Sequence, residues 1–418
     1  MMRNRPSAYP EARVGPASSR SDWRVLGWAH SNPAALVVGV LMLATVSHAQ
    51  TRPAGPAKVY GVGVVGNCCT HGAGLVAKFK NDPRTRVVAA FEANARRAAE
   101  LQVALGGPLA ASYDDVIRNP AVDIVAVSCD PADKATMVEK AAASGKHVFL
   151  NKPFGDSLDN ARRIAAAVER HRVKFVHDIP MVRGVPVFAR LLDEVRAGTH
   201  GRVVGYHHLF GMNFPLDFDL KGRWPERLDP PAKSGGGELT NMGCYAIDYA
   251  VALFGRPQRV IARWQKNWDV YEQTGVENYG QIVLDYGYFL AFLQAGKQQL
   301  AADRRGVANA VTISFEHEML MIDAAARLAT VNQVPQDFAA FEAGAVARGS
   351  LDQLIDAIET DREPSGNAAS GVMATEVLMA AYQSIQDDGR PVDLPLASGA
   401  NPLVARPARP PATSKVGG

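Results

Sequence analysis

Cysteine and net charge are the two scarcest features of this sequence. Only four of its 418 residues are cysteine, too few for the disulfide framework of a small secreted domain. Its 45 lysines and arginines against 42 aspartates and glutamates leave a formal net charge of +3, without the basic surface of a nucleic-acid-binding protein. With 47% hydrophobic residues the composition is globular, and the length predicts two or three domains.

Long hydrophobic runs are also scarce. The run at residues 34–46 is interrupted only by Thr45, and it is shorter than the ~20 residues that span a bilayer. Several arginines precede it, and Ser47-His48-Ala49 follows with the small residues of a signal-peptide cleavage site. We therefore predict a signal-peptide-like leader over residues 1–49, export to the periplasm or the extracellular space, and no stable membrane span after cleavage. A membrane-anchoring helix or a buried core helix is the alternative.

The chain then alternates between strand-like and helix-like segments. Residues 50–57 form a Pro/Gly linker, and residues 58–180 contain short apolar runs separated by stretches of helical periodicity. The predicted strands are 59–66, 85–92, 122–129, 146–151 and 173–178. This alternation is typical of an α/β doubly wound parallel sheet, and it predicts a dinucleotide-binding Rossmann domain over residues 58–180.

The pattern changes after residue 180. Residues 181–388 group their strand-like runs together, which predicts an α+β domain built on a large, mostly antiparallel open sheet. The predicted strands are 202–211, 258–266, 279–287, 288–296, 309–317 and 318–324, and the predicted helices lie near 185–197, 241–254, 350–362 and 368–387. Residues 389–418 are predicted to form a Pro-rich C-terminal tail with a disordered end.

The turn after the first strand occupies the position of a dinucleotide-binding loop. Such a loop needs glycine so that backbone N–H groups can approach a pyrophosphate at a helix N-terminus. Gly66 fits the first glycine of G-x-G-x-x-G, whereas Cys68 and His71 occupy the second and third positions and Gly72 comes one residue late. The match is partial, and an ordinary strand–turn–helix junction is the alternative.

Glu92 ends the second predicted strand and lies near the spacing expected for an acid that binds the ribose 2′-hydroxyl. A carboxylate there favours NAD, because it repels the 2′-phosphate of NADP. Arg96 and Arg97 lie close in sequence and keep NADP open as the cofactor. The alternative is a solvated charge at a strand end.

Lys152 ends the fourth predicted strand, in the stretch GKHVFLNKP over residues 145–153. Ligands of open α/β sheets bind at the carboxyl ends of the strands. A lysine buried there beside a cationic nicotinamide ring would favour its neutral form, which suits general acid/base chemistry. The alternative is a surface charge.

A triple-glycine stretch, GGGELTNMGCYAID over residues 235–248, opens a predicted helix. Helical spacing would place Asn241, Tyr245 and Asp248 on one face. A tyrosine hydroxyl and an asparagine amide on one face could hold a substrate oxygen. The alternative is a helix whose Tyr245 packs in the core.

Four stretches together resemble the Gfo/Idh/MocA family of oxidoreductases: GVGVVG (61–66), GKHVFLNKP (145–153), GTHGRVVG (198–205) and GGGELTNMGCYAID (235–248). The resemblance covers roughly residues 58–395. It implies a Rossmann domain followed by an α+β domain with an open sheet, activity on a sugar, inositol or related polyol, and NAD or NADP as cofactor. It also implies a homo-oligomer formed through the open sheet face.

The resemblance implies roles for individual residues. Lys152 falls on the family's lysine, a proton donor or acceptor and substrate ligand, and Tyr245 falls on the position of the catalytic acid/base. A tyrosine there resembles the glucose–fructose oxidoreductase and dihydrodiol dehydrogenase branches. Gly66 and Glu92 fall on cofactor-binding positions.

Two residues near Lys152 depart from the family pattern. Asn151 stands where the family has glutamate, and Asn241 stands where it has aspartate. Each amide keeps hydrogen bonding but removes a negative charge, so Lys152 would lose neighbours that favour its charged form.

The candidate site residues divide by role. Lys152 and Tyr245 are the predicted catalytic pair. The predicted substrate contacts are Asn241, Arg183 and His208. The predicted cofactor contacts are Gly66, Cys68, His71, Glu92, Asn151 and Lys152. No metal site is predicted, because no C-x-x-C spacing suggests zinc.

The sequence therefore predicts an exported NAD(P)-dependent oxidoreductase that transfers a hydride between a sugar or polyol and nicotinamide. An NAD-dependent glycosidase of the same fold, in which a sugar carbon is oxidised only transiently, is one alternative. A non-catalytic sugar- or nucleotide-binding protein is another, because of the incomplete glycine motif and the two asparagines.

Overall fold

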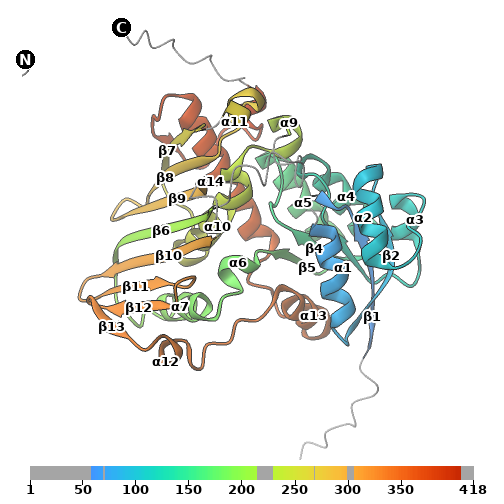
Figure 1. Cartoon of the computed structure of the whole chain (residues 1–418), viewed down its shortest axis with the longest axis horizontal. Helices are drawn as coiled ribbons and strands as arrows, with labels where there is room; N and C mark the ends of the chain where they lie inside the picture. The colour runs from blue at the N-terminus through green and yellow to red at the C-terminus, as the bar shows by residue number, and fades with distance from the viewer. Residues whose placement is uncertain (1–57, 69–70, 214–228, 268, 299–305, 406–418) are drawn as a thin grey trace, which may run out of the picture. The chain divides into compact units, whose positions relative to one another are not determined.

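A computed structural model describes residues 58–68, 71–213, 229–267, 269–298 and 306–405 (Figure 1). All of them belong to one compact unit, Pro56–Gly418. The predicted leader (1–49), the linker (50–57) and residues 406–418 lie outside the described residues. Within the described part of the chain, no helix combines the length and the apolar character needed to cross a membrane.

The first half of the described chain folds around a parallel five-stranded sheet. Its strands lie in the order β2-β1-β3-β4-β5, so the predicted α/β Rossmann fold is confirmed. Their bounds are β1 Tyr60–Val65, β2 Thr85–Phe91, β3 Ile124–Val127, β4 His147–Asn151 and β5 Phe175–Asp178. Every residue of β1 and β3 is buried, because helices cover both faces of such a sheet and favour continuously apolar strands.

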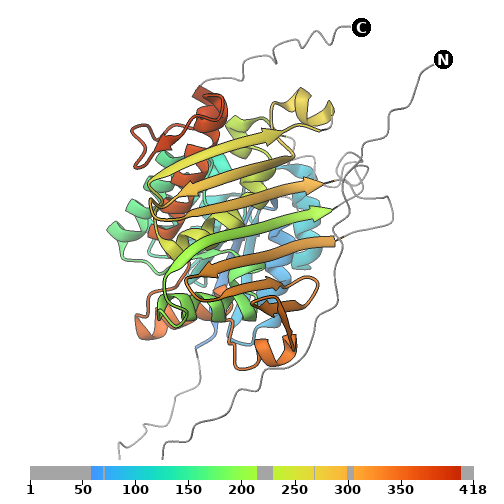
Figure 2. The ribbon, with the colours of Figure 1, turned by 90° about the vertical axis from the view of Figure 1, so that its left-hand side faces the viewer.

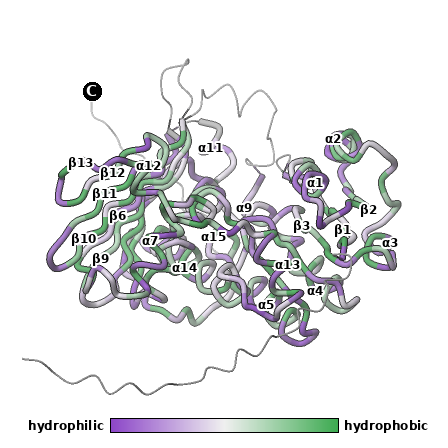
Figure 3. Tube along the Cα trace, turned by 90° about the horizontal axis from the view of Figure 1, so that it is seen from below, coloured by the Kyte–Doolittle hydropathy of each residue, from purple (hydrophilic) through white to green (hydrophobic). Residues whose placement is uncertain are grey.

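Helices pack against both faces of this sheet. One apolar cluster joins it to α3 (Tyr113–Arg118), α4 (Lys134–Ala143) and α5 (Leu158–His171). A second joins the other face to α1 (His71–Asn81), α2 (Ala95–Leu105) and α13 (Ser350–Thr360). Figure 3 shows α1 and α2 alternating between hydrophilic and hydrophobic residues, as expected of helices with one buried face.

The second half of the described chain forms a nine-stranded sheet in the order β13-β12-β11-β10-β6-β9-β8-β7-β14. All neighbouring strands are antiparallel except β6 and β9, which run parallel. The strands are β6 Val203–Asn213, β7 Arg259–Gln265, β8 Tyr279–Asp285, β9 Leu290–Gln298, β10 Gly306–Phe315, β11 Met319–Asp323, β12 Leu328–Val331, β13 Val334–Gln336 and β14 Val392–Asp393. The predicted α+β fold on a mostly antiparallel sheet is therefore confirmed.

The two faces of this sheet have different surroundings. One face packs on α7 (Pro186–Arg196), α10 (Cys244–Phe254) and α14 (Ala368–Gln386), which share its main apolar cluster. Figure 2 shows the other face, broad and without helices in front of it. Along β9, Ala291 and Leu293 point into the core, whereas Leu290 and Phe292 are exposed.

Three short helices and a π-helical turn complete the connections around the site. They are α6 Pro180–Arg183, α9 Pro231–Ser234, η2 Pro131–Asp133 and η5 Leu239–Gly243, the last being the π-helical turn that leads directly into α10. The remaining short helices are α11 Asp269–Thr274, α12 Phe338–Glu342 and α15 Pro402–Ala405.

The structure differs from the predicted organisation near the C-terminus. Helix α13 lies in the region assigned to the second domain, yet its Leu354 and Ile355 pack in the cluster of the parallel sheet. Part of the expected tail is also folded, because β14 pairs with β7 and the side chain of Asn401 donates to the carbonyl of Gly235, at 2.9 Å. Hydrophobic periodicity identifies an apolar helix face but not the sheet on which that face packs.

We expect Leu354→Ala to destabilise the protein by about 2–5 kcal/mol, because Leu354 is fully buried between α13 and the parallel sheet. Urea unfolding followed by circular dichroism measures the free energy of unfolding. Val103→Ala is the matched control, since Val103 on α2 is 83% exposed and should change stability by less than about 0.5 kcal/mol. Equal effects of the two substitutions would contradict this packing.

Candidate active site

A pocket lies at the carboxyl ends of β1, β3 and β4. The strand order places β1 between β2 and β3. The chain therefore runs from β1 to one side of the sheet and later returns to the other side, and open α/β sheets bind ligands at such a switch point. From the side of the parallel sheet it is lined by residues that include Cys68, His71, Ser128, Asp130, Asn151 and Lys152. From the opposite side it is lined by residues that include Asp229, Lys233, Gly237, Thr240 and Asn241.

The glycine loop is one residue longer than the pattern used to predict it. Gly66 has φ +86°, and a Cβ there would lie 2.3 Å from the backbone nitrogen of Cys129. A Cβ at Gly72 would lie 2.0 Å from the carbonyl oxygen of Gly66. Gly72 therefore provides the close helix–loop packing expected of the third glycine, a position that the G-x-G-x-x-G spacing assigns to His71.

Asn67 holds this loop against α1, a role that sequence reasoning missed. It is fully buried, its Oδ1 accepts from the N–H of Ala73 at 2.9 Å, and its Nδ2 donates to the carbonyl of Arg97 at 3.1 Å. The N–H of Cys68 donates to the carbonyl of Ser128 at 2.9 Å, which ties the loop to β3. Asn67 falls on an x position of G-x-G-x-x-G, where the motif accepts any residue, so the sequence does not indicate this role.

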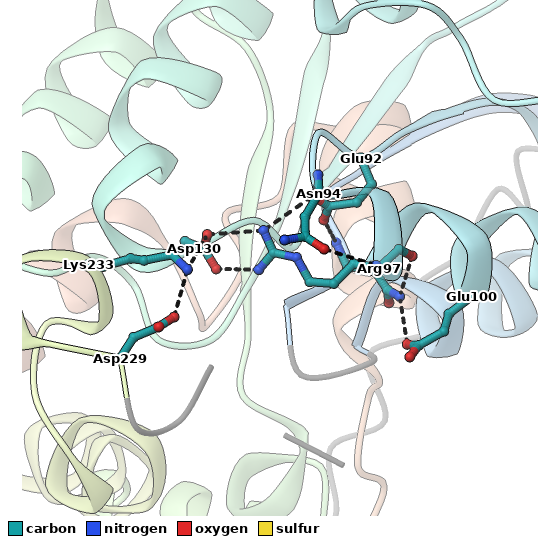
Figure 4. A network of polar contacts seen from close by, with 8 residues as sticks. Glu92, Asn94, Arg97, Glu100, Asp130, Asp229 and Lys233 are labelled. Carbon is teal, nitrogen blue, oxygen red and sulfur yellow. Dashed lines mark hydrogen bonds and ion pairs between the residues drawn. The ribbon is translucent and has the colours of Figure 1, made fainter. Parts of the chain in front are cut away.

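Glu92 lies at the end of β2, where a ribose-binding acid was predicted, and is almost fully buried. It accepts from the N–H groups of Asn67 and Asn94, both at 2.7 Å, and from the Arg97 guanidinium at 3.2 Å (Figure 4). These contacts fix its carboxylate beside the glycine loop. Arg97 is held by Glu92 and so is not placed as a free cation for a 2′-phosphate.

Arg97 also crosses from α2 to the end of β3. Its Nη1 lies 2.6 Å from Oδ1 of Asp130, and Oδ2 of Asp130 lies 3.6 Å from Nζ of Lys233. Burial acts to raise the pKa of Asp130, but the hydrogen bond and charge of Arg97 outweigh it and lower that pKa. Lys233 binds Asp229 at 2.7 Å, so the network extends to the opposite wall of the pocket (Figure 4).

Lys152 is 6% exposed and lines the pocket at the end of β4. Its Nζ donates to the side-chain oxygen of Asn241 and, at 3.2 Å, to the backbone carbonyl of the same residue. The other side-chain atom of Asn241, Nδ2, donates to Glu238 at 2.7 Å. These contacts fix the orientation of the Asn241 amide, with its oxygen toward Lys152 and its nitrogen toward Glu238.

Behind Lys152 lies a second buried lysine that sequence reasoning missed. Lys134 is 1% exposed, and its Nζ donates to the carbonyl oxygens of Asn151 and Pro153, the two neighbours of Lys152 in the chain. Burial lowers the pKa of Lys134 to about 8. Asn151 also contacts His71, whose Nδ1 lies 3.1 Å from its Oδ1.

The π-helical turn η5 changes the predicted geometry of Asn241, Tyr245 and Asp248. Asn241 lines the pocket, whereas Tyr245 is 4% exposed and packs against Phe210 with ring centroids 5.0 Å apart. The Lys152 ammonium lies 5.7 Å from the Tyr245 ring centroid, so the tyrosine lies behind the described pocket wall. The wider turn breaks the regular α-helical spacing on which the prediction of one shared face depended.

The glycine stretch before η5 is held by a buried acid. Glu277 accepts from the N–H of Gly237 at 3.2 Å, from the N–H of Leu239 at 2.8 Å and from the hydroxyl of Tyr382 at 2.8 Å. Burial raises the pKa of Glu277 to about 7. A Cβ at Gly237 would lie 2.2 Å from the Glu277 carbonyl oxygen, so this position requires glycine.

Two predicted substrate contacts, Arg183 and His208, lie outside the set of described residues that line this pocket. The Arg183 guanidinium binds the carboxylate of Asp248 and donates to the carbonyl of Ser365 at 2.7 Å. His208 is 1% exposed between the Tyr206 hydroxyl and Asn309, at 3.2 and 3.1 Å, and burial lowers its pKa to about 4. In this structure both stabilise the second domain.

The loop and its surroundings fit a dinucleotide. Gly66 and Gly72 let the loop pack closely against β3 and α1, and the first turn of α1 contains no acidic residue that would repel a pyrophosphate. Glu92 is held at the end of β2, the position of the ribose-binding acid in dinucleotide-binding folds. Among the described residues, no group of three or more His, Cys, Asp or Glu side chains is placed to hold a metal ion.

A parallel sheet with a glycine loop and a buried lysine at a strand end, followed by a second, mostly antiparallel sheet, is an arrangement typical of dinucleotide-binding folds. Residues 60–178 match the family described as "Oxidoreductase family, NAD-binding Rossmann fold", and residues 188–316 match the GFO/IDH/MocA C-terminal domain. The chain belongs to the Gfo/Idh/MocA family, and residues 60–178 form an NAD-binding Rossmann domain.

Named relatives are similar over part of their length. D-xylose dehydrogenase of Paenarthrobacter nicotinovorans is 27% identical over 183 residues, which are 41% of this chain and 46% of the relative. Trans-1,2-dihydrobenzene-1,2-diol dehydrogenase of Xenopus laevis is 24% identical over 177 residues, 42% of this chain and 49% of the relative. The chain thus spans about half the length of the curated relatives it matches.

Solved structures share the fold over a larger region. Scyllo-inositol dehydrogenase from Lactobacillus casei, with bound NAD(H) and scyllo-inositol, is 18% identical and aligns with a TM-score of 0.64. The alignment covers 80% of this chain and 99% of that one, so the similarity includes both sheets.

We expect Glu92→Gln to reduce the preference for NAD over NADP by about tenfold, because the amide keeps one acceptor but removes the charge that repels a 2′-phosphate. Dissociation constants for both cofactors, measured by isothermal titration calorimetry, test this. Glu169→Gln is the control, since Glu169 is exposed on α5 and should leave both constants unchanged. An unchanged ratio in Glu92→Gln would show that Glu92 does not discriminate between the cofactors.

Proposed function

We propose that the protein is an NAD-dependent oxidoreductase that transfers a hydride between a carbinol carbon of a sugar or polyol-type substrate and nicotinamide. The observation that carries this proposal is Lys152, a buried lysine in the pocket wall at the end of β4, which β3 separates from the strand that leads into the glycine loop. The names of the xylose and inositol dehydrogenases that share sequence or fold support the substrate class.

The reaction moves a hydride and a proton in opposite directions. NAD, when bound, supplies C4 of the nicotinamide as hydride acceptor. With its amine neutral, Lys152 accepts the proton of the substrate hydroxyl as the hydride leaves the carbinol carbon, so that the carbinol becomes a ketone and NAD would be reduced to NADH. Asn241 orients the side-chain nitrogen of Lys152, and Lys134 holds the backbone on both sides of it. Tyr245 supports this lysine from behind and shares in the proton transfer.

We expect Lys152→Met to lower kcat by about 10²–10⁴-fold, the usual contribution of a general acid/base, while NAD binding persists. Tyr245→Phe should lower kcat in the same direction, because it removes the hydroxyl but keeps the packing against Phe210. NADH formation with a panel of sugars and inositols measures both effects.

Lys140→Met is the matched control for the lysine, since Lys140 is half exposed in a surface ion pair with Asp114. Unchanged turnover in both Lys152→Met and Tyr245→Phe would overturn the assignment. Stoichiometric accumulation of NADH distinguishes a dehydrogenase from a glycosidase of this fold, which would recycle its cofactor.

We further propose that the protein forms a homo-oligomer through the open face of the nine-stranded sheet. Leu290 and Phe292 of β9 are 43% and 38% exposed, and the Phe292 ring stacks on His207 of β6 at 4.8 Å. An apolar patch of this kind on a broad sheet favours association with a second, identical face.

Phe292→Glu should therefore shift the protein toward the monomer in analytical ultracentrifugation, because it buries a charge in the proposed interface. Val103→Glu, on the exposed surface of α2, is the control and should leave the sedimentation coefficient unchanged. Wild-type protein that sediments as a monomer at micromolar concentration would refute the proposal.

We also propose export, on the strength of residues 1–49, which lie outside the described residues. Mass spectrometry of protein recovered from the periplasm or medium should show a chain that begins at Gln50. Recovery of the full-length chain from the cytoplasm alone would exclude it.

A further inference from the structure

Glu238, the residue before the π-helical turn η5, is a buried acid to which the reaction described above gives no role. It is 1% exposed, and its N–H donates to the carbonyl oxygen of Glu277 at 2.9 Å. Its Oε1 lies 3.0 Å from Nζ of Lys297, which is equally buried. Because a buried ion pair is often no more stabilising than a pair of apolar side chains, its presence next to a pocket points to a role other than stability.

The lysine of this pair is held in the nine-stranded sheet. Lys297 lies near the end of β9, its N–H donates to the carbonyl oxygen of Asn278 at 2.7 Å, and its own carbonyl accepts from Nδ2 of Asn278 at 3.0 Å. The hydroxyl of Tyr271 also donates to Oε1 of Glu238, at 3.4 Å. The carboxylate of Glu238 is therefore anchored from outside the pocket.

The other oxygen of this carboxylate contacts the pocket wall. Oε2 of Glu238 accepts from Nδ2 of Asn241 at 2.7 Å, and the two residues are three apart on a helical turn. A carboxylate only accepts hydrogen bonds, whereas an amide has one donating and one accepting end. Glu238 therefore selects the orientation in which Oδ1 of Asn241 faces Lys152, whose Nζ donates to it.

Resting on the proposed function, we propose that Glu238 is a positioning residue of the reaction. Paired with Lys297, it holds the Asn241 amide so that Lys152 meets an acceptor oxygen. Without this acid the amide can rotate, and its NH₂ group would then face the donors of the lysine. Asn241 stands where the family pattern has aspartate, so the acid lies one contact further from Lys152 and acts on it through the amide.

A purely structural role for Glu238 makes a different prediction. Such a role needs only the contacts of Glu238 with Lys297 and Glu277, so a change at Asn241 would have the same effect whether or not the acid is present. In a positioning role, the effects of substitutions at 238 and 241 depend on each other, because the two side chains are direct hydrogen-bond partners.

The test exchanges the acid and the amide between the two positions. Asn241→Asp sets a second carboxylate against Glu238, and Glu238→Gln lets the amide of Asn241 rotate. We expect each substitution to lower kcat about tenfold, with the dissociation constant for NAD unchanged in isothermal titration calorimetry.

The double variant Glu238→Gln/Asn241→Asp should recover kcat to within about threefold of the wild type. In it the introduced glutamine can donate to the introduced aspartate, and a carboxylate presents an oxygen to Lys152 in either orientation. NADH formation with the best polyol of the panel, at saturating NAD, measures kcat, and differential scanning fluorimetry measures the melting temperature of all four proteins.

The matched control exchanges an acid and an amide on the surface. Glu169→Gln combined with Gln336→Glu changes two exposed residues in the same way and should leave kcat unchanged. If Glu238→Gln does not fold because Lys297 loses this acid, Lys297→Met is added to it and to the double variant. Asn241→Asp should then raise kcat in the background that lacks both charges, although it lowers kcat in the wild type.

The outcomes separate this inference from the proposed function. Independent effects of the two substitutions on kcat overturn the positioning role and leave the oxidoreductase intact. Coupling that appears in the melting temperature but not in kcat also overturns it, because the pair would then support the fold alone. Wild-type protein that reduces no NAD with any polyol overturns the proposed function and, with it, the role of Glu238.

Discussion

The structure of the site depends on the buried ion pair between the carboxylate of Glu92 and the guanidinium of Arg97. Glu92 accepts N–H groups from the glycine loop after β1 and from the start of α2, and it binds Arg97. Arg97 in turn binds Asp130 at the end of β3. A charge this deeply buried is tolerated only when its partners are fixed, so this network holds the ends of three strands in register.

Buried polar groups with fixed hydrogen-bond partners also determine the geometry around Lys152. The ammonium of Lys134 is satisfied by two backbone carbonyls, which hold the end of β4 and leave the positive charge in place. Asn241 orients Lys152 because its amide has one acceptor for the lysine and one donor for Glu238. An amide can serve both partners at once, whereas an aspartate would bring a second negative charge toward Glu238.

Much of the fold was predictable because its signals are local. The buried strands of the parallel sheet are continuous apolar runs, and α5 begins at a capping serine, Ser157, and buries Leu158, Ala161 and Ile164 at helical spacing. Elements of a few residues, such as β14, were not predicted, because two residues carry no periodicity and pair only where β7 is already present.

The site was predictable in its motif residues but not in its supporting ones. Lys152 and Asn241 lie at strand or helix ends that motifs mark, and both line one pocket, whereas Glu92, at the end of β2, lies outside the described residues that line it. Lys134 and Asn67 escaped prediction because their roles depend on backbone groups distant in sequence. Arg183 and His208 lie outside the described pocket lining, because Arg183 binds Asp248 and His208 contacts Asn309. Their positions in the sequence near strand ends do not reveal these hydrogen-bond partners.

The sequence by itself determined the class of fold, the position of the glycine loop and the family, because hydrophobic periodicity and short motifs are properties of neighbouring residues. Only the tertiary structure decided that Gly72 packs on the loop, that Tyr245 lies behind the pocket wall, and that α13 completes the parallel sheet. The tertiary structure also decided how the charged side chains are distributed around the pocket. Around the pocket, Asp130 pairs with Arg97, Asp178 with Lys78 and Glu238 with Lys297, so that buried charges of opposite sign lie next to each other in a chain with a formal charge of +3.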